Sequence, residues 1–418
     1  FFVGGGFGFA YFFDLSEAGG GGISQILRGF YTTPTNYTDK GIYWVNPIAD
    51  MLVPQRATLF GWALLFPCLH LLYRAAILDE HRLFLPLGVL AGCLPLVHTH
   101  SFLALGVISL VLLIANCLSL RGGLRLFLCY GLIAAVLAAP QLLCFTFKQA
   151  ASGSFLRLHW NWVNDKDSWL WFYVKNMGLI FLLMPPALAC ARRESRLFFA
   201  GGALLWLICE LVVFQPNLYD NNKLIFVSYA LMCGLTAEFM AKVWTALREG
   251  ALRRAAPVLA AFTLTACFLS GGLTLAREYV SGDHLGLGGW VESGYQVVSA
   301  QQRRLAEYVS ENTEPDAVFA TATNHNNAIA MLTGRSIVCG AGTFLYYHGL
   351  DYQPREAALK LVYEQPAEWL DFYAQEYGID YLLVSSHERG SWAVDEEYFA
   401  AELDCVYSDG DLALYSLK

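Results

Sequence analysis

Long apolar runs separated by short polar connections occupy the first two thirds of the chain. Each run approaches the roughly 20 apolar residues with which a helix crosses the hydrocarbon core of a bilayer. Eight spans are predicted, at Met51–Leu72, Leu83–Leu96, Phe102–Leu118, Leu124–Phe145, Trp169–Cys190, Leu197–Phe214, Leu224–Trp244 and Ala256–Ala276. A ninth, at residues 1–13, is incomplete and has neither an initiator Met nor a basic leader, so we expect the chain to be N-terminally truncated.

The pattern changes after Ala276, where short apolar stretches alternate with amphipathic ones. Helices are predicted at Val297–Thr313, Asn324–Leu332, Pro354–Gln365 and Pro366–Tyr377, and strands at Ala317–Thr321, Ser336–Gly340, Asp380–Ser385, Leu403–Tyr407 and Leu412–Leu417. The last two strands are predicted to form a closing hairpin. Strands that alternate with helices predict a small α/β domain with a mainly parallel sheet. The expected fold class is therefore a multi-span α-helical membrane domain over residues 1–276, followed by a soluble α/β domain over residues 277–418.

Composition supports a membrane protein with a water-soluble part. Of the 418 residues, 56% are hydrophobic and 15% are charged, and the mean hydropathy is +0.43. These values exclude a purely soluble enzyme, because soluble domains contain about 25% charged residues. Residues 277–418 carry 8 Lys and Arg against 22 Asp and Glu, a net charge of −14, whereas residues 1–276 carry +6. An acidic domain without a basic stripe disfavours nucleic acid as a partner.

The cysteines and the short motifs restrict the chemistry further. Nine of the 11 cysteines lie in apolar regions and are interpreted as small buried hydrophobic side chains. Cys339 and Cys405 lie in the acidic domain, where they can form a disulfide if the compartment is oxidising. The sequence has no His/Cys metal pattern, no GxGxxG and no Walker motif, so we assign no metal ligands and expect no nucleotide cofactor, while dependence on a metal stays open at the level of the sequence.

Basic residues in alternate connections indicate the orientation in the membrane. They are Arg74, Arg82, Arg121, Arg125, Arg192, Arg193, Arg196, Lys242, Arg248, Arg253 and Arg254. The positive-inside rule places these connections in the cytoplasm. The remaining connections and the acidic domain are then extracytoplasmic, and the expected location is a multi-pass protein of the plasma membrane.

The outer connections contain most of the polar groups of interest. His98 and His100 stand in a short turn between apolar segments, where ionisable groups are costly and commonly functional, and an imidazole can donate to a phosphate oxygen. Asp220, Asn222 and Lys223 form a second such turn, which suits recognition of sugar hydroxyls and a phosphate. The alternatives are hydrogen-bonded packing for the histidines and a charged helix cap for the second turn.

Three further features of the outer connections suggest ligand binding. Asp39 lies among aromatic residues and can act as a general base or bind a sugar hydroxyl, although a solvated loop with an interfacial anchor is the alternative. Arg56, at the outer end of a long helix, can clamp a phosphate or extend to the membrane interface. The Trp-rich residues 158–169 can stack on sugar rings or form an interfacial aromatic belt.

Taken together, the many helices, the His98–Ser101 turn, the Asp220–Lys223 turn and the α/β domain resemble the GT-C superfamily of integral membrane glycosyltransferases. The resemblance implies transfer of a sugar from a polyprenyl-phosphate donor to a glycan, lipid or protein acceptor on the outer face. In that family an acidic residue of the first outer loop acts as the base, and the resemblance leads us to expect that this chain begins after that loop. Asp39 is the substitute candidate, and His98, His100, Lys223 and Arg56 suit the departing phosphate.

Two other functions remain open at the level of the sequence. A transporter or flippase of lipid-linked glycans needs similar cations but predicts polar residues through the whole bilayer, whereas Glu210 is the main acidic exception within the apolar runs. A non-catalytic membrane protein that presents its soluble domain for binding leaves the polar turns without a role.

Overall fold

The computed structural model describes residues 1–13, 22–28, 32–118, 123–151, 155–281 and 296–417. The chain divides into two compact units, residues 1–150 with 155–293 and residues 151–154 with 294–418. The boundary predicted at Ala276 falls inside the last long helix of the first unit, which continues to Ser281.

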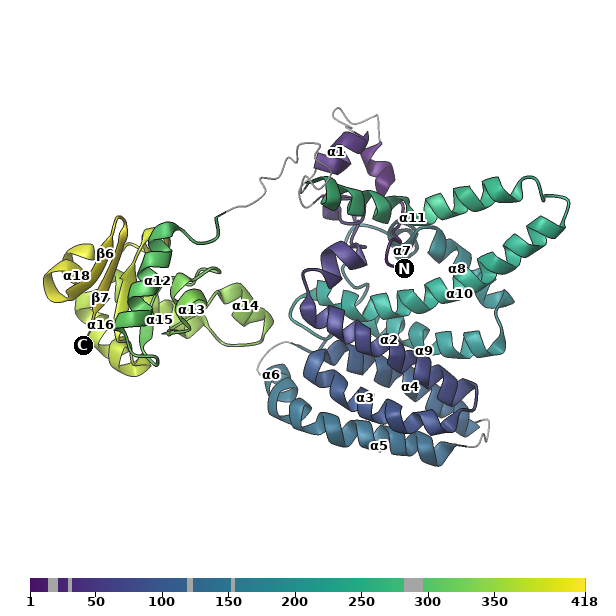
Figure 1. Cartoon of the computed structure of the whole chain (residues 1–418), viewed down its shortest axis with the longest axis horizontal. Coiled ribbons are helices and arrows are strands. Elements are labelled where there is room, and N and C mark those ends of the chain that lie inside the picture. Colours follow the sequence, from purple (N-terminus) through teal and green to yellow (C-terminus); the bar gives the residue numbers. More distant parts are fainter. Residues whose placement is uncertain (14–21, 29–31, 119–122, 152–154, 282–295, 418) are drawn as a thin grey trace. The chain divides into compact units, whose positions relative to one another are not determined.

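The first unit is helical (Figure 1). Its helices are α1 (Gly22–Arg28), α2 (Arg56–Ile77), α3 (Phe84–Val97), α4 (Thr99–Leu118), α5 (Leu124–Gln141), α6 (Phe147–Ala151), α7 (Trp169–Met177), α8 (Leu179–Cys190), α9 (Arg193–Leu211), α10 (Asn222–Glu249) and α11 (Ala256–Ser281). Short turns of 3₁₀ or π helix are η1 (Gly8–Phe12), η2 (Thr38–Lys40), η3 (Pro47–Leu52), η4 (His81–Leu83), η5 (Leu142–Thr146) and η6 (Leu218–Asn221). Two short strands, β1 (Arg157–Leu158) and β2 (Val212–Val213), pair antiparallel.

Five helical segments of the described residues are long and apolar enough to cross a membrane. They are α2, α4, α5 with its continuation to Ala151, η6 with α10, and α11, and the pair α7 and α8 adds a sixth if it counts as one bent span. The expected number, about nine, is higher because three predicted spans are not among these: the opening residues, treated below, and the helices α3 and α9. Helix α3 has 14 residues, which reach about 21 Å and fall short of a bilayer core. Helix α9 carries Arg193, Glu194, Arg196 and Glu210.

The single span predicted at Trp169–Cys190 is broken. Helices α7 and α8 meet at an angle of 102°. Gly178, between them, has φ 60° and ψ −134°, a conformation that side chains other than hydrogen rarely allow. The periodicity of apolar residues continues through the break, so the sequence pattern does not reveal it.

The opening residues do not form part of a spanning helix. Residues 4–6 are glycines that run between α7 and α11, and the short turn η1 follows them. A Cβ atom on Gly6 would lie 1.8 Å from the Lys175 carbonyl oxygen, and one on Gly271 of α11 would lie 2.1 Å from the Val3 carbonyl oxygen. Glycine is therefore required here for close backbone contact, and the expectation of an incomplete ninth helix is wrong.

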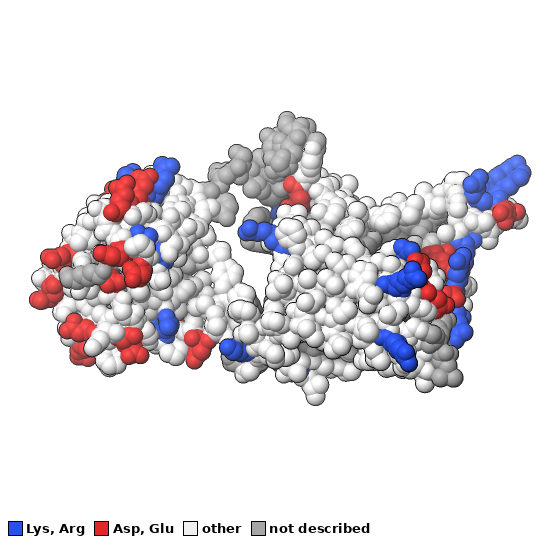
Figure 2. Space-filling model, turned by 60° about the horizontal axis from the view of Figure 1, so that its bottom comes forward, with Lys and Arg blue, Asp and Glu red and all other residues white. Residues whose placement is uncertain are grey.

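Charged side chains of the first unit concentrate at one end, and much of the remaining surface in view is uncharged (Figure 2). Basic residues there are interspersed with acidic ones. Arg74 pairs with Glu80, and Glu238 of α10 pairs with Lys242 at 2.8 Å and with Arg192 at 3.8 Å. An uncharged surface next to a charged end is what a bilayer requires, because charges are costly in hydrocarbon.

The second unit is a five-stranded sheet with helices. Its elements are α12 (Ala300–Asn312), β3 (Val318–Ala320), α13 (Ala328–Thr333), β4 (Ser336–Ile337), α14 (Gly342–Tyr347), α15 (Gln353–Glu364), α16 (Pro366–Tyr377), β5 (Tyr381–Val384), α17 (Ser386–Ser391), α18 (Glu396–Glu402), β6 (Asp404–Asp409) and β7 (Leu412–Ser416). Local sequence signals explain where several of these helices begin. Ser299 and Gln302 form a capping box at α12, and α15 and α16 have Pro in their first turn.

The sheet is mixed, so the prediction of a mainly parallel sheet needs correction. The strand order is β4-β3-β5-β7-β6. Strand β3 pairs parallel with β4 and β5, whereas β7 pairs antiparallel with β5 and β6. The closing hairpin adds its two strands beside β5, and a hairpin is antiparallel by construction.

The disulfide considered between Cys339 and Cys405 does not form. Both cysteines are free. Cys339 follows β4 and Cys405 lies in β6, which are the opposite edges of the sheet. Five strands at about 4.8 Å spacing separate these edges by roughly 19 Å, well beyond the reach of a disulfide.

Candidate functional site

A cavity of about 460 Å³ lies where three connections between helices of the first unit meet. We call it the aromatic pocket. Its lining comes from residues 36–45, from the Trp-rich residues 159–165 and from the turn before α10: Asn36, Thr38, Tyr43, Val45, His159, Trp160, Trp162, Val163, Asn164, Asp165, Asn217, Leu218 and Tyr219. Aromatic faces with a few amides and a carboxylate at their edges match the apolar face and polar rim of a sugar ring.

The Trp-rich loop is held in an unusual conformation. Strand β1 pairs with β2, and the Trp162 indole N–H donates to the Leu218 carbonyl at 3.0 Å. The Trp162 ring is buried and stacks on Tyr219 with centroids 5.9 Å apart. Asn161 and Trp162 have φ of 72° and 41°, which is costly for residues other than glycine. Such strain persists where the surroundings fix it, and it concentrates at functional sites.

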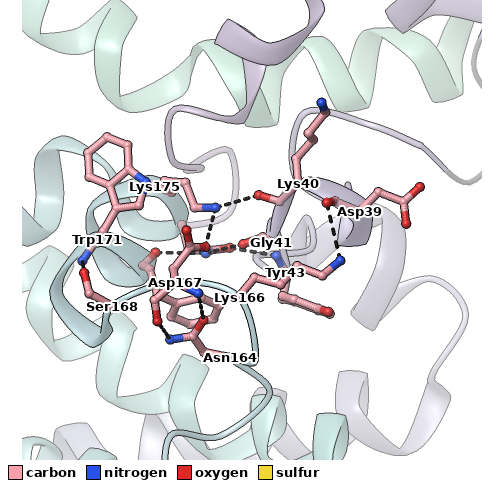
Figure 3. Close-up of polar contacts among 12 residues, drawn as sticks. Asp39, Lys40, Gly41, Tyr43, Asn164, Lys166, Asp167, Ser168, Trp171 and Lys175 are labelled. Atoms are coloured by element: carbon pink, nitrogen blue, oxygen red, sulfur yellow. Dashed lines mark hydrogen bonds and ion pairs between the residues drawn. The ribbon is translucent and has the colours of Figure 1, made fainter.

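A buried ion pair joins the Trp-rich loop to the loop of residues 36–45 (Figure 3). Lys175 is 4% exposed, and its ammonium lies 2.5 Å from Asp167 and donates to the Lys40 carbonyl at 2.6 Å. Asn164 accepts from the Asp167 backbone N–H at 3.0 Å. Asn176 donates to the Gly41 carbonyl at 3.0 Å and accepts from the Tyr43 N–H at 2.7 Å. These contacts hold two walls of the aromatic pocket together.

The two predicted polar turns meet in space. The Lys223 ammonium interacts electrostatically with both His98 and His100, whose rings lie 5.3 Å apart. The His98 Nδ1 atom lies 2.8 Å from the Ser101 hydroxyl, whereas its buried Nε2 atom has no hydrogen-bond partner in the described part of the chain. Lys223 pairs with Asp220 at 3.2 Å. The His98 and His100 imidazoles and the Lys223 ammonium thus lie in one region, although the His98–Ser101 turn and the start of α10 are far apart in the sequence.

Tyr219 joins this set to the aromatic pocket. Its hydroxyl donates to the Tyr43 carbonyl at 3.3 Å, and it interacts with the Asn222 amide and with the carboxylates of Asp50 and Asp220. We call Asp50, His98, His100, Asp220, Asn222 and Lys223 the polar cluster. Asn222 is buried, and Asp220 and Lys223 are partly buried.

Asp50 was not among the sequence candidates. It lies in η3, where its Oδ2 atom accepts from the Asn46 N–H at 2.8 Å. Burial raises the pKa of Asp50, the Asn46 hydrogen bond opposes this, the Glu278 carboxylate raises the pKa further, and Arg277 lowers it. The sequence contained a signal for this residue. Asn46-Pro47 is a typical start of a helical turn, and Asp50 is the acidic residue of that turn.

Asp39 and Arg56 lie outside the polar cluster. Asp39 is exposed in η2, and Figure 3 shows its carboxylate directed away from Lys166, which instead contacts the Asp39 backbone carbonyl at 3.3 Å. Burial raises the pKa of Tyr43, and the Asp165 and Asp39 carboxylates raise it further, so both acids lie near this wall of the pocket. Arg56 is exposed at the start of α2 and makes no side-chain hydrogen bond or ion pair with the described residues.

Within the described residues, no group of three or more His, Cys, Asp or Glu side chains is arranged to hold a metal ion. The side chains of the polar cluster can supply proton transfer by carboxylates, hydrogen bonding by the amide and the two imidazoles, and charge stabilisation by Lys223. No protein-family model matches the chain, and no curated protein matches it.

Proposed function

We propose that this protein is a membrane glycosyltransferase that moves a sugar from a polyprenyl-phosphate donor to an acceptor hydroxyl at the outer membrane surface. The acceptor oxygen attacks the anomeric carbon, the bond from that carbon to the phosphate oxygen breaks, and the lipid phosphate leaves. The acceptor proton passes to a carboxylate. Sugar transfer of this kind needs a base, a cationic site for the phosphate and a surface for the sugar ring.

The observation that carries the proposal is the convergence of His98, His100 and Lys223, from separate helices, beside the aromatic pocket. Lys223 and the unpartnered Nε2 atom of His98 are suited to the phosphate of the donor. Tyr43, Trp160 and Tyr219 offer faces on which a sugar ring can stack. The apolar helices beside these groups are suited to the polyprenyl chain.

Two acids are candidates for the base. Asp50 is partly buried and lies next to Tyr219, where the pocket and the polar cluster meet. Its raised pKa strengthens it as a proton acceptor. Asp39, exposed near Tyr43, remains the candidate from the sequence. We assign the base to Asp50, because it interacts with Tyr219, which lines the sugar pocket and also interacts with Asn222 and Asp220.

The test is transfer of radiolabelled sugar from a panel of polyprenyl-phosphate donors, in membranes with and without the full-length protein. Lys223→Ala should lower transfer about 100-fold, as expected when a charge that stabilises a leaving group is removed. Lys242→Ala is the matched control, since Lys242 lies on the same helix α10 but in the charged end, paired with Glu238.

The aromatic pocket has its own matched pair in the same assay. Trp160→Ala should raise KM about tenfold by removing a stacking surface, whereas Trp171→Ala should leave it unchanged, because Trp171 is 51% exposed on α7 and does not line the pocket. Transfer that is absent with every donor, or equal in Lys223→Ala and Lys242→Ala, would overturn the proposal.

A further inference from the structure

A groove of about 650 Å³ runs between α8 and α9, on a part of the first unit that the polar cluster does not use. It is lined by Pro185, Leu188, Ala189, Phe199, Ala200 and Ala203, with one charged residue, Arg196. Leu182 of α8 and Leu207 of α9 are 48% and 51% exposed, so both helices present apolar side chains outward. A groove with these properties, on helices of a membrane protein, suits a hydrocarbon chain.

The charged residue at the groove is part of a cationic segment. Residues 192–196 read Arg-Arg-Glu-Ser-Arg, with a net charge of +2. Glu238 of α10 is already engaged by Lys242 at 2.8 Å, by the Ser195 hydroxyl at 2.8 Å and by Arg192 at 3.8 Å. Arg196 makes no ion pair and no side-chain hydrogen bond within the described part of the chain, so its guanidinium is available to an external anion.

We propose that this groove binds a phospholipid with a net negative headgroup, its acyl chain between α8 and α9 and its phosphate on Arg196. A planar guanidinium can donate two parallel hydrogen bonds to a phosphate, and the net positive charge of residues 192–196 favours an anionic headgroup over a zwitterionic one. The apolar groove lies next to the Arg196 cation, just as the acyl chains of a phospholipid lie next to its phosphate.

This lipid site is distinct from the phosphate site of the proposed reaction. Arg196 lies near the start of α9, and the connection to the polar cluster follows the end of that helix at Leu211. Fifteen residues of helix separate the two positions, which corresponds to about 22 Å. The same phosphate cannot occupy both sites, so the proposal stands whether or not the protein transfers sugars.

The test uses the full-length chain in detergent, stripped of lipid and titrated with phosphatidylglycerol or phosphatidylcholine of identical acyl chains, with native mass spectrometry as the readout. Arg196→Ala should weaken phosphatidylglycerol binding about fivefold and phosphatidylcholine binding less, because the choline cation already neutralises the phosphate of the second lipid. Ala200→Phe, a change at an exposed groove position, should weaken both lipids by filling the groove. Arg125→Ala is the control, because Arg125 is exposed at the start of α5 and lines no part of the groove.

Arg196 is exposed, so its removal should leave the fold intact, and thermal unfolding of each variant checks this. Equal binding of the two lipids by the unmodified protein would overturn the proposal. So would unchanged phosphatidylglycerol binding in Arg196→Ala, or an equal loss in Arg125→Ala, which would indicate a diffuse surface charge.

Discussion

Asp50 illustrates how one side chain connects the local turn to the proposed chemistry. The Asn46 hydrogen bond fixes its orientation, and burial together with Glu278 raises its pKa. A base must be deprotonated to accept a proton, so a raised pKa moves the loss of activity on the acid side to higher pH.

We therefore expect sugar transfer to fall, as the pH is lowered, at a pH above the ordinary carboxyl pKa of about 3.9. Asp50→Asn should abolish most of the transfer. Glu278→Gln should shift the acid side of the profile to lower pH, because it removes a negative charge that raises the Asp50 pKa. The measurement is initial rate against pH.

Asp39→Asn separates the two candidate bases. If Asp50 is the base, this variant keeps the pH profile of the unmodified protein. Loss of transfer in Asp39→Asn together with an unchanged profile in Asp50→Asn would move the role to Asp39.

At the scale of elements, the contact between α11 and the opening residues depends on the absence of a side chain. Gly271→Ala would place a methyl group 2.1 Å from the Val3 carbonyl oxygen, so the two segments must separate. Overpacking of this kind costs about 1–3 kcal/mol. We expect a lower thermal unfolding temperature of the full chain in detergent.

Gly272→Ala is the control for this change, since a Cβ there meets nothing within 4 Å. Alanine favours a helix over glycine by roughly 1 kcal/mol, so this neighbouring variant should be neutral or slightly more stable. Equal destabilisation by both variants would show that helix geometry, and not the contact with Val3, decides the outcome.

The sequence pattern predicted most helices and strands. It predicted neither the break between α7 and α8 nor the order of the strands in the sheet. Asn222–Glu249 and Ala256–Ser281 are long helices where apolar runs predicted spans, and Asp380–Ser385 contains β5. The turn at Gly178 was missed because apolar character continues on both sides of it, and only a backbone dihedral distinguishes it. The hairpin of β6 and β7 was predicted, but the pairing of β7 with β5 was missed because strand order is set by contacts between distant residues.

The candidate site was predicted in part, for a related reason. Charged and imidazole groups in short turns between apolar helices can be recognised along the chain, which identified His98, His100, Asp220 and Lys223. Lys175 was overlooked because it lies inside an apolar helix, and its partner Asp167 comes from the preceding loop. Such pairs depend on how a loop folds back, which periodicity does not encode.

At the scale of the whole molecule, the sidedness of the second unit is the prediction that matters most. Cys405 is exposed in β6, whereas Cys339 is buried and its pKa is raised by burial to about 11, which slows its reaction with thiol reagents. If the second unit is extracytoplasmic, a membrane-impermeant maleimide should label Cys405 in intact cells.

The variant Cys405→Ser is the control for this labelling. Maleimide should no longer label the second unit of this variant. Labelling of Cys405 only after the cells are opened would place the second unit inside. That result would contradict the orientation inferred from the basic connections and the proposed outer-face reaction.

The two edges of the five-stranded sheet have a consequence for proteins that share a membrane. Diffusion within a bilayer brings copies of the second unit together at high local density, where an exposed strand can recruit another strand. Strand β4 has two residues, and β6 carries Asp404 and Asp409, so one edge is too short to template pairing and the other carries charge. The sheet is thereby protected against edge-to-edge association under lateral crowding.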